Sequence, residues 1–364
     1  MRVVITGGGT GGHAYPATSI AEAIRRKHHD WRLLYLGSKG GPEAELANKA
    51  GIEFVGLSSR KLKKLASPDT LLTAAVLARG FVEALAVLRK FRADLVIGTG
   101  GYVAAAVVLA QALRRGHILI HEQNVIPGRT NKWLSRFADR ICISFEDTLA
   151  YFPKEKTVLT GMPIRSAFSN PPDKKTARKL LGLEEQLFTV LVLGGSQGAR
   201  KINEIVADCL PTLRNLPIQI IHQSGRRNFE EAQMRQKSQN WENYHLFPYI
   251  EDMVTAYAAS NLVVSRGGAS TICEITAMGL PAIIIPYPFA QANHQQLNAE
   301  YLARAGAAVV ILEANLSPKV LSDTITQLME SPEKLVEMGK ASKALGRPNA
   351  AEKVLEVAME LVGN

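Results

Sequence analysis

Glycine-rich turns that follow short apolar runs are the most informative residues for chemistry in this sequence. GGGTGGH at residues 7–13 contains Thr10, Gly11, Gly12 and His13. Main-chain N–H groups at such a turn, together with the start of a helix, bind phosphate. Histidine suits general-base catalysis near neutral pH, so the residue that ends this turn is a candidate base. The alternative is a turn whose glycines only allow close packing, followed by a polar helix start.

Two further segments repeat this arrangement after other apolar runs. GGSQGAR at residues 194–200 offers main-chain N–H groups and the hydroxyl of Ser196 to a phosphate. GTGGY at residues 98–102 contains Gly100, Gly101 and Tyr102, and it either lines an acceptor site or only connects a strand to a helix. The recurrence of two glycine turns in matched places favours a phosphate-bearing ligand over two incidental turns.

A second kind of site is indicated by the sequence SRGGASTICE at residues 265–274. A helix is expected to start after Gly268, with Ser270 and Thr271 in its first turn and Glu274 about one turn in. The start of a helix suits a diphosphate, and a carboxylate there can accept two hydrogen bonds from ribose hydroxyls. Glu274 is equally interpretable as an acid that stabilises its own helix. The amide-rich segment at 289–298 suits sugar hydroxyls, or is only a solvated helix start.

Missing motifs narrow the chemistry. The sequence has no Asp-x-Asp, the motif with which metal-dependent transferases commonly hold a divalent ion on a diphosphate, and no zinc-type cluster. We therefore expect no metal and no cofactor, and a cation such as Arg165 on the diphosphate. The second predicted strand ends at Leu36 without the acid that holds a dinucleotide ribose, which argues against a nicotinamide-dependent oxidoreductase.

Composition excludes other classes. The formal charge of +10 favours an anionic partner, but the basic residues carry no nucleic-acid-binding signature, so we expect no nucleic acid. Three widely spaced cysteines indicate reduced thiols in a cytosolic protein. The first residues enter a strand without a signal-peptide apolar region, and no apolar run reaches membrane-spanning length.

The elements that must position these residues alternate between short apolar strands and helical patterns, as βαβ units do. Turn residues at 161–163 and 169–173 interrupt the pattern, which then restarts. We predict an α/β fold of two Rossmann-like, doubly wound parallel-sheet domains facing a central cleft, at 1–163 and 164–347. A C-terminal helix at about 348–364 is expected to pack back on the first domain. Pro16 is expected in the first turn of the first helix. The predicted strands are Val3–Thr6, Leu33–Leu36, Phe54–Leu57, Leu95–Gly98, Ile118–His121, Arg140–Ser144, Thr189–Leu193, Ile218–His222, Leu262–Ser265, Ala282–Pro286 and Ala308–Leu312.

One helical pattern bears on membrane contact. The expected core stripe is Leu71, Ala74, Ala78, Phe81, Leu85 and Leu88, whereas Leu72, Val76 and Val87 face the opposite side. A basic cluster of Arg60, Lys61, Lys63 and Lys64 precedes the helix. An apolar patch beside a basic cluster suits an anionic membrane surface. The alternative is a helix buried on both faces beside a solvated run of charge.

The motifs at 8–13 and 100–102, HEQN at 121–124, GGSQGAR and the run to Glu274 resemble, in order, the MurG family of bacterial transferases. The resemblance implies the GT-B fold and UDP-N-acetylglucosamine (UDP-GlcNAc) as donor. It also implies an undecaprenyl-linked muramyl-pentapeptide acceptor, lipid I, which becomes lipid II for peptidoglycan. Its location would be the cytoplasmic side of the cell membrane, bound peripherally to the anionic inner-membrane surface. The chain departs from the family in Met162, where asparagine is common, and in a slightly longer stretch before Gln296.

The resemblance also implies site residues. Uridine would lie near Ile250 and the ribose on Glu274. A single inverting displacement by the muramyl 4-hydroxyl is expected, with His13 as base and Glu122 in reserve. A UDP-GlcNAc 2-epimerase, a diacylglycerol glycosyltransferase of the same fold and a non-catalytic sugar-nucleotide sensor remain alternatives. The implied donor contacts are Thr10, Gly11, Gly12, Asn124, Arg165, Ser196, Ile250, Ala269, Ser270, Thr271, Ile272, Cys273, Glu274 and Gln296.

Overall fold

The computed structural model describes residues 1–9, 11–60, 69–195, 198–237 and 241–363. Their contacts divide the chain into two compact units, Met1–Ser166 with Pro348–Asn364, and Ala167–Arg347. Several predicted site residues lie outside the described residues, as does the side chain of Leu72; they are Thr10, Lys61, Lys63, Lys64 and Ser196.

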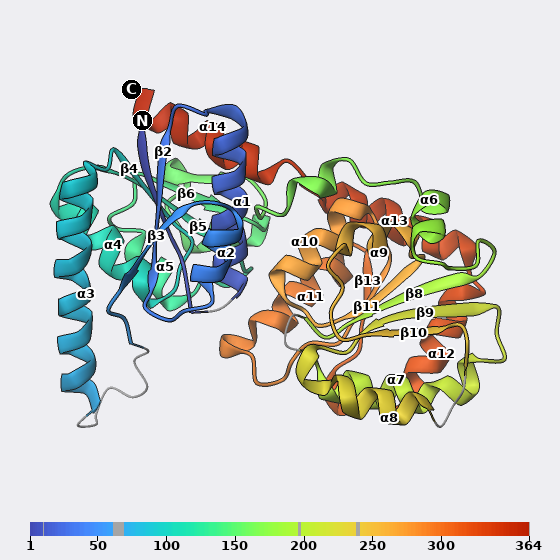
Figure 1. The fold of residues 1–364 in the computed structure, drawn as a ribbon. Helices are drawn as coiled ribbons and strands as arrows, with labels where there is room; N and C mark the ends of the chain where they lie inside the picture. Colours follow the sequence, from blue (N-terminus) through green and yellow to red (C-terminus); the bar gives the residue numbers. More distant parts are fainter. Residues whose placement is uncertain (10, 61–68, 196–197, 238–240, 364) are drawn as a thin grey trace. The chain divides into compact units, whose positions relative to one another are not determined.

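The described part of the first unit contains a seven-stranded, all-parallel sheet in the order β3-β2-β1-β4-β5-β6-β7 (Figure 1). The third strand in this order, β1, pairs Val4 with Leu34 on one side and with Val96 on the other. The order reverses beside β1, and in such sheets the carboxyl ends of the strands next to the reversal form the binding edge. The strands are β1 (Arg2–Thr6), β2 (Arg32–Ser38), β3 (Glu53–Leu57), β4 (Leu95–Gly98), β5 (His117–Glu122), β6 (Arg140–Ile143) and β7 (Thr157–Leu159).

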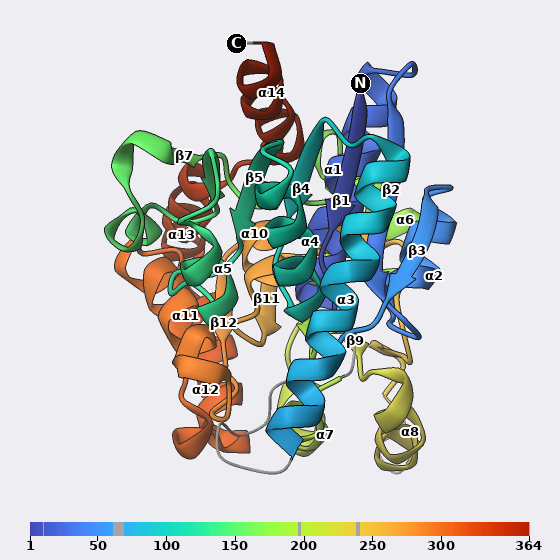
Figure 2. The ribbon, with the colours of Figure 1, turned by 90° about the vertical axis from the view of Figure 1, so that its left-hand side faces the viewer.

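Helices cover both faces of this sheet (Figure 2). α1 (Gly11–Lys27) and α14 (Ala350–Gly363) share one apolar core with the sheet, while α3 (Asp69–Phe91), α4 (Tyr102–Leu113) and α5 (Arg129–Leu134) share the other. The short α2 (Glu43–Lys49) follows β2. Short 3-10 helices of this unit are η1 (Glu146–Tyr151) and η2 (Lys154–Lys156), and η3 (Ser166–Ser169) follows at the junction.

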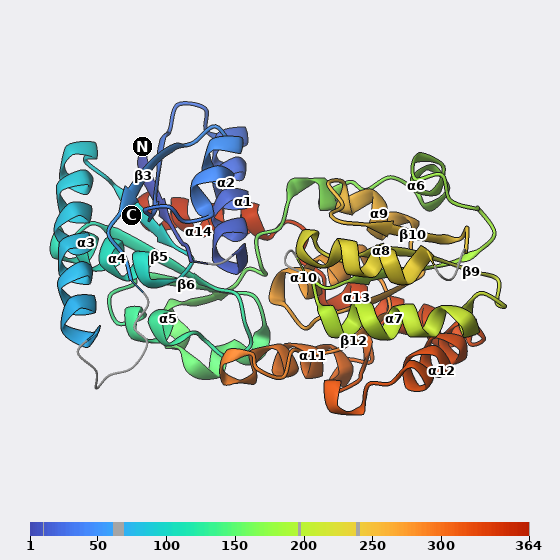
Figure 3. The same ribbon diagram turned by 60° about the horizontal axis from the view of Figure 1, so that its bottom comes forward.

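In its described residues the second unit has a six-stranded parallel sheet in the order β10-β9-β8-β11-β12-β13. α7 and α12 pack in one core with it, and α9 and α10 lie on the opposite face (Figures 1 and 3). The strands are β8 (Phe188–Leu193), β9 (Ile218–Gln223), β10 (Tyr244–Phe247), β11 (Leu262–Ser265), β12 (Ala282–Ile284) and β13 (Ala308–Val310). The helices are α6 (Lys174–Leu180), α7 (Arg200–Leu213), η4 (Arg226–Asn228), α8 (Phe229–Lys237), α9 (Met253–Ala259), α10 (Ala269–Met278), η5 (Gln291–Asn293), α11 (His294–Arg304), η6 (Glu313–Asn315), α12 (Pro318–Met329) and α13 (Pro332–Leu345).

All the predicted strands are present, with ends shifted by up to two residues. β7 and β10, at the edges of the two sheets, were not predicted. The prediction for Pro16 was wrong: α1 begins at Gly11, which places this proline in the second helical turn.

The predicted core stripe of α3 was wrong at Ala74 and Ala78, and the side chain of Leu71 lies outside the described residues. The prediction for Val87 on the opposite side of the helix was also wrong, because this residue packs against the apolar core. Ala74 and Ala78 are exposed, whereas Thr73 and Ala84 are buried. The reason is a close backbone approach at Gly80, where an added Cβ would lie 2.1 Å from the carbonyl oxygen of Ser58. This contact sets the rotation of the helix against the sheet. Within the described residues, no helix is both long and apolar enough to cross a membrane.

Candidate functional site

The first and third glycine turns pack against each other at the carboxyl ends of β1 and β4. The Gly8 N–H donates to the Gly100 carbonyl at 3.2 Å, and the Thr99 hydroxyl donates to the His13 carbonyl at 2.7 Å. A Cβ at Gly101 would lie 2.3 Å from the Gly8 carbonyl oxygen, so a side chain cannot be added there without moving the backbone. The structure thus brings together Gly11, Gly12 and His13 at the start of α1 with Gly100 and Gly101.

His13 lies in the first turn of α1 and is half-buried. Its Nδ1 lies 2.9 Å from the Thr99 carbonyl oxygen and 3.0 Å from Gln123 Oε1. Room for the imidazole depends on Gly100, because a Cβ there would lie 2.9 Å from His13 Nδ1. The candidate base therefore stands between two glycine turns and the HEQN segment.

The HEQN segment is organised by the carboxylate of Glu122, whose residue is 1% exposed. One oxygen accepts the backbone N–H groups of Gln123 and Asn124 at 2.9 and 3.0 Å. The other accepts from the Gly128 N–H at 3.1 Å and the Asn131 amide at 2.9 Å. Asn124 is held here too, because its carbonyl accepts from the Thr148 hydroxyl at 3.1 Å. Glu122 thus fixes the loop that carries Asn124.

Sequence reasoning missed Glu43, which lies directly behind the first glycine turn. It is 0% exposed, and its carboxylate accepts the Ser38 N–H at 2.7 Å and the Gly9 N–H at 3.4 Å. A Cβ at Gly8 would lie 2.2 Å from Glu43 Oε1. A buried carboxylate is costly unless hydrogen-bonded, so this acid is tied to the turn. Its position shortly after β2 was the available signal.

Arg165 belongs to the first unit, close to Glu22 of α1. Burial raises the pKa of Glu22 above its ordinary value, and the positive charges of Arg165 and Arg26 partly offset that rise. On the acceptor side, Tyr102 is the first residue of α4 and is half-buried, as are Arg60 and Val76.

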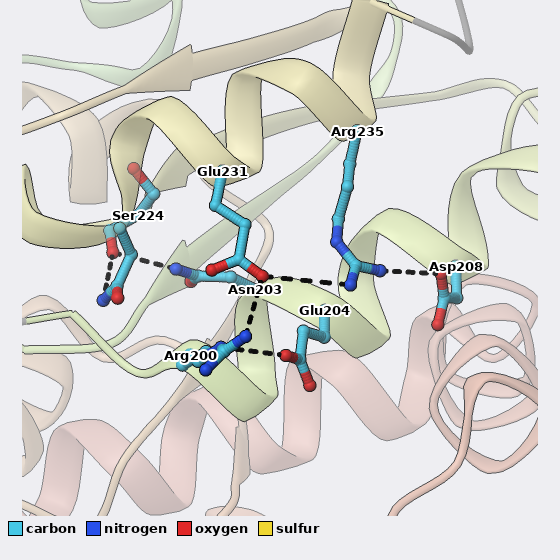
Figure 4. A network of polar contacts seen from close by, with 8 residues as sticks. Arg200, Asn203, Glu204, Asp208, Ser224, Glu231 and Arg235 are labelled. Atoms are coloured by element: carbon cyan, nitrogen blue, oxygen red, sulfur yellow. Dashed lines mark hydrogen bonds and ion pairs between the residues drawn. The ribbon is translucent and has the colours of Figure 1, made fainter.

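The second glycine turn leads into α7 of the second unit. Arg200 at the start of α7 pairs with Glu204 at 3.1 Å and with Glu231 at 3.2 Å (Figure 4). Its guanidinium is therefore already bound to two carboxylates. A residue that sequence reasoning missed joins this turn to the predicted uridine position: Gln223 donates to the Gly195 carbonyl at 3.4 Å and accepts the Ile250 N–H at 2.8 Å. Ile250 itself is buried.

The predicted contact residues of α10 differ in burial. Ser270, Thr271, Cys273 and Glu274 are half-buried on its outer side, whereas Ala269 and Ile272 are buried. The last two therefore offer a ligand only main-chain atoms. The Tyr257 hydroxyl donates to Glu274 at 3.0 Å.

α11 lies beside the start of α10. A Cβ at Gly267 would lie 2.2 Å from the Gln295 carbonyl oxygen, and Asn298 donates to the Gly267 carbonyl at 3.1 Å. Gln296 follows on α11, where its amide donates to Glu300 at 2.9 Å. The second unit thus brings the start of α11, with Gln296, beside the turn before α10.

Among the described residues, no group of three or more His, Cys, Asp or Glu side chains is placed to hold a metal ion. The polar groups gathered in the two units are main-chain N–H groups, amides, hydroxyls and single carboxylates. Such groups suit phosphate and sugar hydroxyls.

The comparisons agree with this chemistry. Residues 3–143 match the glycosyltransferase family 28 N-terminal domain, and residues 189–354 match its C-terminal domain. A relative from Desulfitobacterium hafniense (strain Y51), named UDP-N-acetylglucosamine--N-acetylmuramyl-(pentapeptide) pyrophosphoryl-undecaprenol N-acetylglucosamine transferase, is 43% identical over 99% of each chain.

Solved structures extend the likeness to the fold. Acinetobacter baumannii MurG matches with a TM-score of 0.81 and 29% identity over 99% of both chains. A UDP-GlcNAc 2-epimerase from Neisseria meningitidis, at 17% identity and a TM-score of 0.69 over 99% of this chain and 100% of its own, shares the fold alone. The two parallel-sheet domains and the first match confirm the predicted GT-B fold class. On its identity to the full length of such a transferase, this chain belongs to the MurG family, the UDP-N-acetylglucosamine–N-acetylmuramyl-(pentapeptide) pyrophosphoryl-undecaprenol N-acetylglucosamine transferases.

Proposed function

We propose that this chain transfers N-acetylglucosamine from UDP-GlcNAc to the 4-hydroxyl of the muramyl sugar of lipid I, forming lipid II for peptidoglycan. The observation that carries the proposal is the 43% identity to a transferase of that name over 99% of both chains. The 2-epimerase alternative is supported only by a likeness of fold at 17% identity. No observation favours the diacylglycerol transferase alternative.

The two domains divide the substrates. Residues 164–347 bind UDP-GlcNAc, with uracil near Ile250, the ribose on Glu274 and the diphosphate at the start of α10. Residues 1–163 bind the acceptor beside the first and third glycine turns. Support for this division comes from Gln223, which links Ile250 to the second glycine turn, and from the half-buried polar side chains on the outer side of α10.

The transfer is a single inverting displacement. The muramyl 4-hydroxyl oxygen bonds to the anomeric carbon, the bond from that carbon to the UDP phosphate oxygen breaks, and the hydroxyl proton passes to His13. The start of α10, Arg165 and Ser196 stabilise the negative charge that develops on the leaving UDP. His13 is preferred to Glu122 as base because N–H groups from four residues already donate to the Glu122 carboxylate.

The acceptor carries a lipid, so the protein works peripherally at the cytoplasmic side of the membrane, on its anionic surface. Arg60 and the α3 residues Val76 and Val82 support this location; the last has 62% of its surface exposed. A further apolar side chain, Leu113 at the end of α4, is also 62% exposed.

A transfer assay tests the proposal. Labelled UDP-GlcNAc is incubated with and without a short-chain lipid I analogue, each with and without a chelator. We expect a labelled disaccharide lipid only when the acceptor is present, in equal amount with the chelator. Epimerised UDP-sugar from donor alone, with no transfer, would replace the proposal with the epimerase alternative.

A further inference from the structure

A continuous chain of hydrogen bonds runs from His13 through Gln123 to the buried His121. Gln123 Oε1 faces His13 Nδ1 at 3.0 Å. Gln123 Nε2 lies 2.9 Å from the His121 carbonyl oxygen and 3.1 Å from His121 Nδ1. His121 Nε2 faces the Gly161 carbonyl oxygen at 2.9 Å. Gln123 is 2% exposed and His121 is 0% exposed, so water does not compete for these partners.

Each donor in this chain is fixed by a carbonyl oxygen, which can only accept. The Gly161 carbonyl requires a proton on His121 Nε2. Burial lowers the pKa of His121 to about 4, so its ring is neutral and its Nδ1 is a hydrogen-bond acceptor. The His121 carbonyl requires the amide nitrogen of Gln123 on its own side. That nitrogen has two hydrogens, one for the carbonyl and one for His121 Nδ1.

The amide orientation then decides the state of His13. With its nitrogen committed to His121, Gln123 can only present its oxygen to His13 Nδ1. The other neighbour of His13 Nδ1 is the Thr99 carbonyl oxygen at 2.9 Å, which also can only accept a hydrogen bond. A nitrogen facing two acceptors must carry the hydrogen, so in the neutral ring the lone pair is on Nε2.

We propose that Gln123 is a positioning residue, which with His121 holds His13 as the Nδ1–H tautomer and aims Nε2 at the acceptor hydroxyl. This inference rests on the proposed function only in making His13 the base. The partner is an amide, so proton transfer to His13 creates a cation held by neutral oxygens rather than by a carboxylate. The buried carboxylates on the packed elements, Glu122 on β5 and Glu43 on α2, are bound to backbone N–H groups.

The tautomer is measurable without any substrate. Nitrogen-15 spectra of histidine ring nitrogens distinguish protonated from unprotonated positions, and comparison with a His13→Gln variant identifies the His13 signals among the eight histidines. Above the pH at which His13 is protonated, we expect a protonated Nδ1 and an unprotonated Nε2. The opposite pattern would overturn the proposal whatever the enzyme's activity.

Kinetics of two variants test the positioning role. Gln123→Met keeps the shape of the side chain without its hydrogen bonds; we expect kcat to fall roughly ten- to hundredfold, with KM for UDP-GlcNAc changed less than about twofold. Gln123→Glu places a carboxylate beside His13 Nδ1; we expect the acidic limb of the pH–kcat profile to move up by about one pH unit or more. A role in folding alone would not produce that shift.

The matched control is Gln111→Met. Gln111 is 0% exposed in the same unit, and its amide faces Asp94 and His117 at the opposite ends of the strands. We expect no change in its pH profile. Unaltered kcat and pH profile in both Gln123 variants, with wild type active and His13→Ala inactive, would refute the positioning role alone. No product from wild type would instead refute the proposed function, and the spectra would still test the tautomer.

Discussion

The side chains of Glu122, Glu274 and His13 differ in the groups that they contact in the structure. The oxygens of Glu122 accept N–H groups along its own loop, so this side chain supports the site from behind. Glu274 is half-buried on the outer side of α10, with the Tyr257 hydroxyl on one oxygen. Two hydrogen-bond contacts of the His13 ring use Nδ1, so they leave the role of proton acceptor to Nε2. We base the proposed roles of base, loop support and ribose contact on these differences rather than on residue type.

Replacing the base should affect turnover and leave donor binding alone. For His13→Ala we expect kcat to fall by about two to four orders of magnitude, because proton transfer to a positioned base contributes that much. UDP affinity, measured by calorimetry, should not change because His13 is not among the proposed donor contacts. The control is His29→Ala, which removes an exposed histidine of the first unit. Unreduced turnover in His13→Ala would move the role of base to another residue.

Removing the acceptor capacity of Glu122 should affect folding as well as rate. In Glu122→Gln, the new amide nitrogen faces N–H groups, which leaves buried donors unpaired. We expect the free energy of unfolding to fall by about 1–3 kcal/mol in urea titrations. Glu155→Gln, at an exposed acid of the same unit, should stay close to wild type. Wild-type stability in Glu122→Gln would show that the loop does not depend on this carboxylate.

Side-chain contacts across the fold were the part of the site that sequence patterns did not reveal. The glycine turns, His13 and Glu274 follow directly from local sequence. Glu43, Gln123 and Gln223 act on segments distant in the chain: the Gln223 amide reaches Ile250, which lies 27 positions later. No local periodicity encodes such pairs, because they depend on which strands become neighbours.

Among the elements, the central strands and the edge strands β3 and β13 were predictable, whereas the edge strands β7 and β10 were not. β1, β4 and β11 are continuous apolar runs because helices cover both faces of a parallel sheet. β7 has three residues, all half-buried, and β10 has only Tyr244 fully buried. These two edge strands have little apolar surface to cover, so their sequences differ little from a loop.

α3 shows how a backbone contact overrides a hydrophobic pattern. In Gly80→Ala the new methyl group meets the rigid Ser58 carbonyl at 2.1 Å, so the helix must move. We expect a loss of about 1–3 kcal/mol of unfolding free energy, which exceeds the usual helical gain from alanine. Gly363→Ala is the matched control: it is helical, with nothing within 4 Å of the added Cβ, and should be neutral or slightly stabilising. Equal stability of the two variants would contradict the contact.

β5 and β9 each have a fully buried histidine beside their last residue, and both histidines resist protonation. Burial lowers the pKa to about 4 for His121 and about 3 for His222. The unfolded chain binds the proton near pH 6.5, so unfolding is coupled to proton uptake below that pH. The stability that each neutral histidine contributes is complete above pH 6.5 and declines as pH falls towards the folded pKa.

We therefore expect the free energy of unfolding to fall by about 2 kcal/mol for each buried histidine when the pH is lowered from 7 to 5. Urea titrations at the two pH values measure the change. In His222→Asn the dependence on pH should become smaller, because one of the two buried groups is gone. A pH dependence identical to wild type in that variant would contradict the assignment.

The whole chain has a formal charge of +10, which acts over distances longer than any single contact. We expect binding to vesicles with anionic lipid that weakens as salt is raised, because exposed charges are screened. Val82→Glu should reduce the bound fraction by adding a negative charge to an exposed apolar position of α3. Val336→Glu on α13 of the second unit, also exposed, is the control. Sedimentation that is indifferent to lipid charge would contradict the membrane proposal.

Binding of UDP by the second unit is common to the transferase and epimerase alternatives, and it separates both from a nicotinamide-dependent oxidoreductase. The fold alone is common to transferases and epimerases, as the matches at low identity illustrate. Both classes need the UDP-sugar, and a dehydrogenase or a protein without a nucleotide site does not. Binding of UDP at α10 is therefore the claim on which the transfer proposal depends.

Calorimetric titration of UDP into the wild type, Glu274→Ala and an exposed-acid control, Glu333→Ala, tests that claim most directly. Hydrogen bonds to a charged group contribute about 1.5–3 kcal/mol, so we expect Glu274→Ala to bind UDP about ten- to hundredfold more weakly. Glu333→Ala should match the wild type. Absence of UDP binding by the wild type, or equal affinity in Glu274→Ala, would contradict this account of the site.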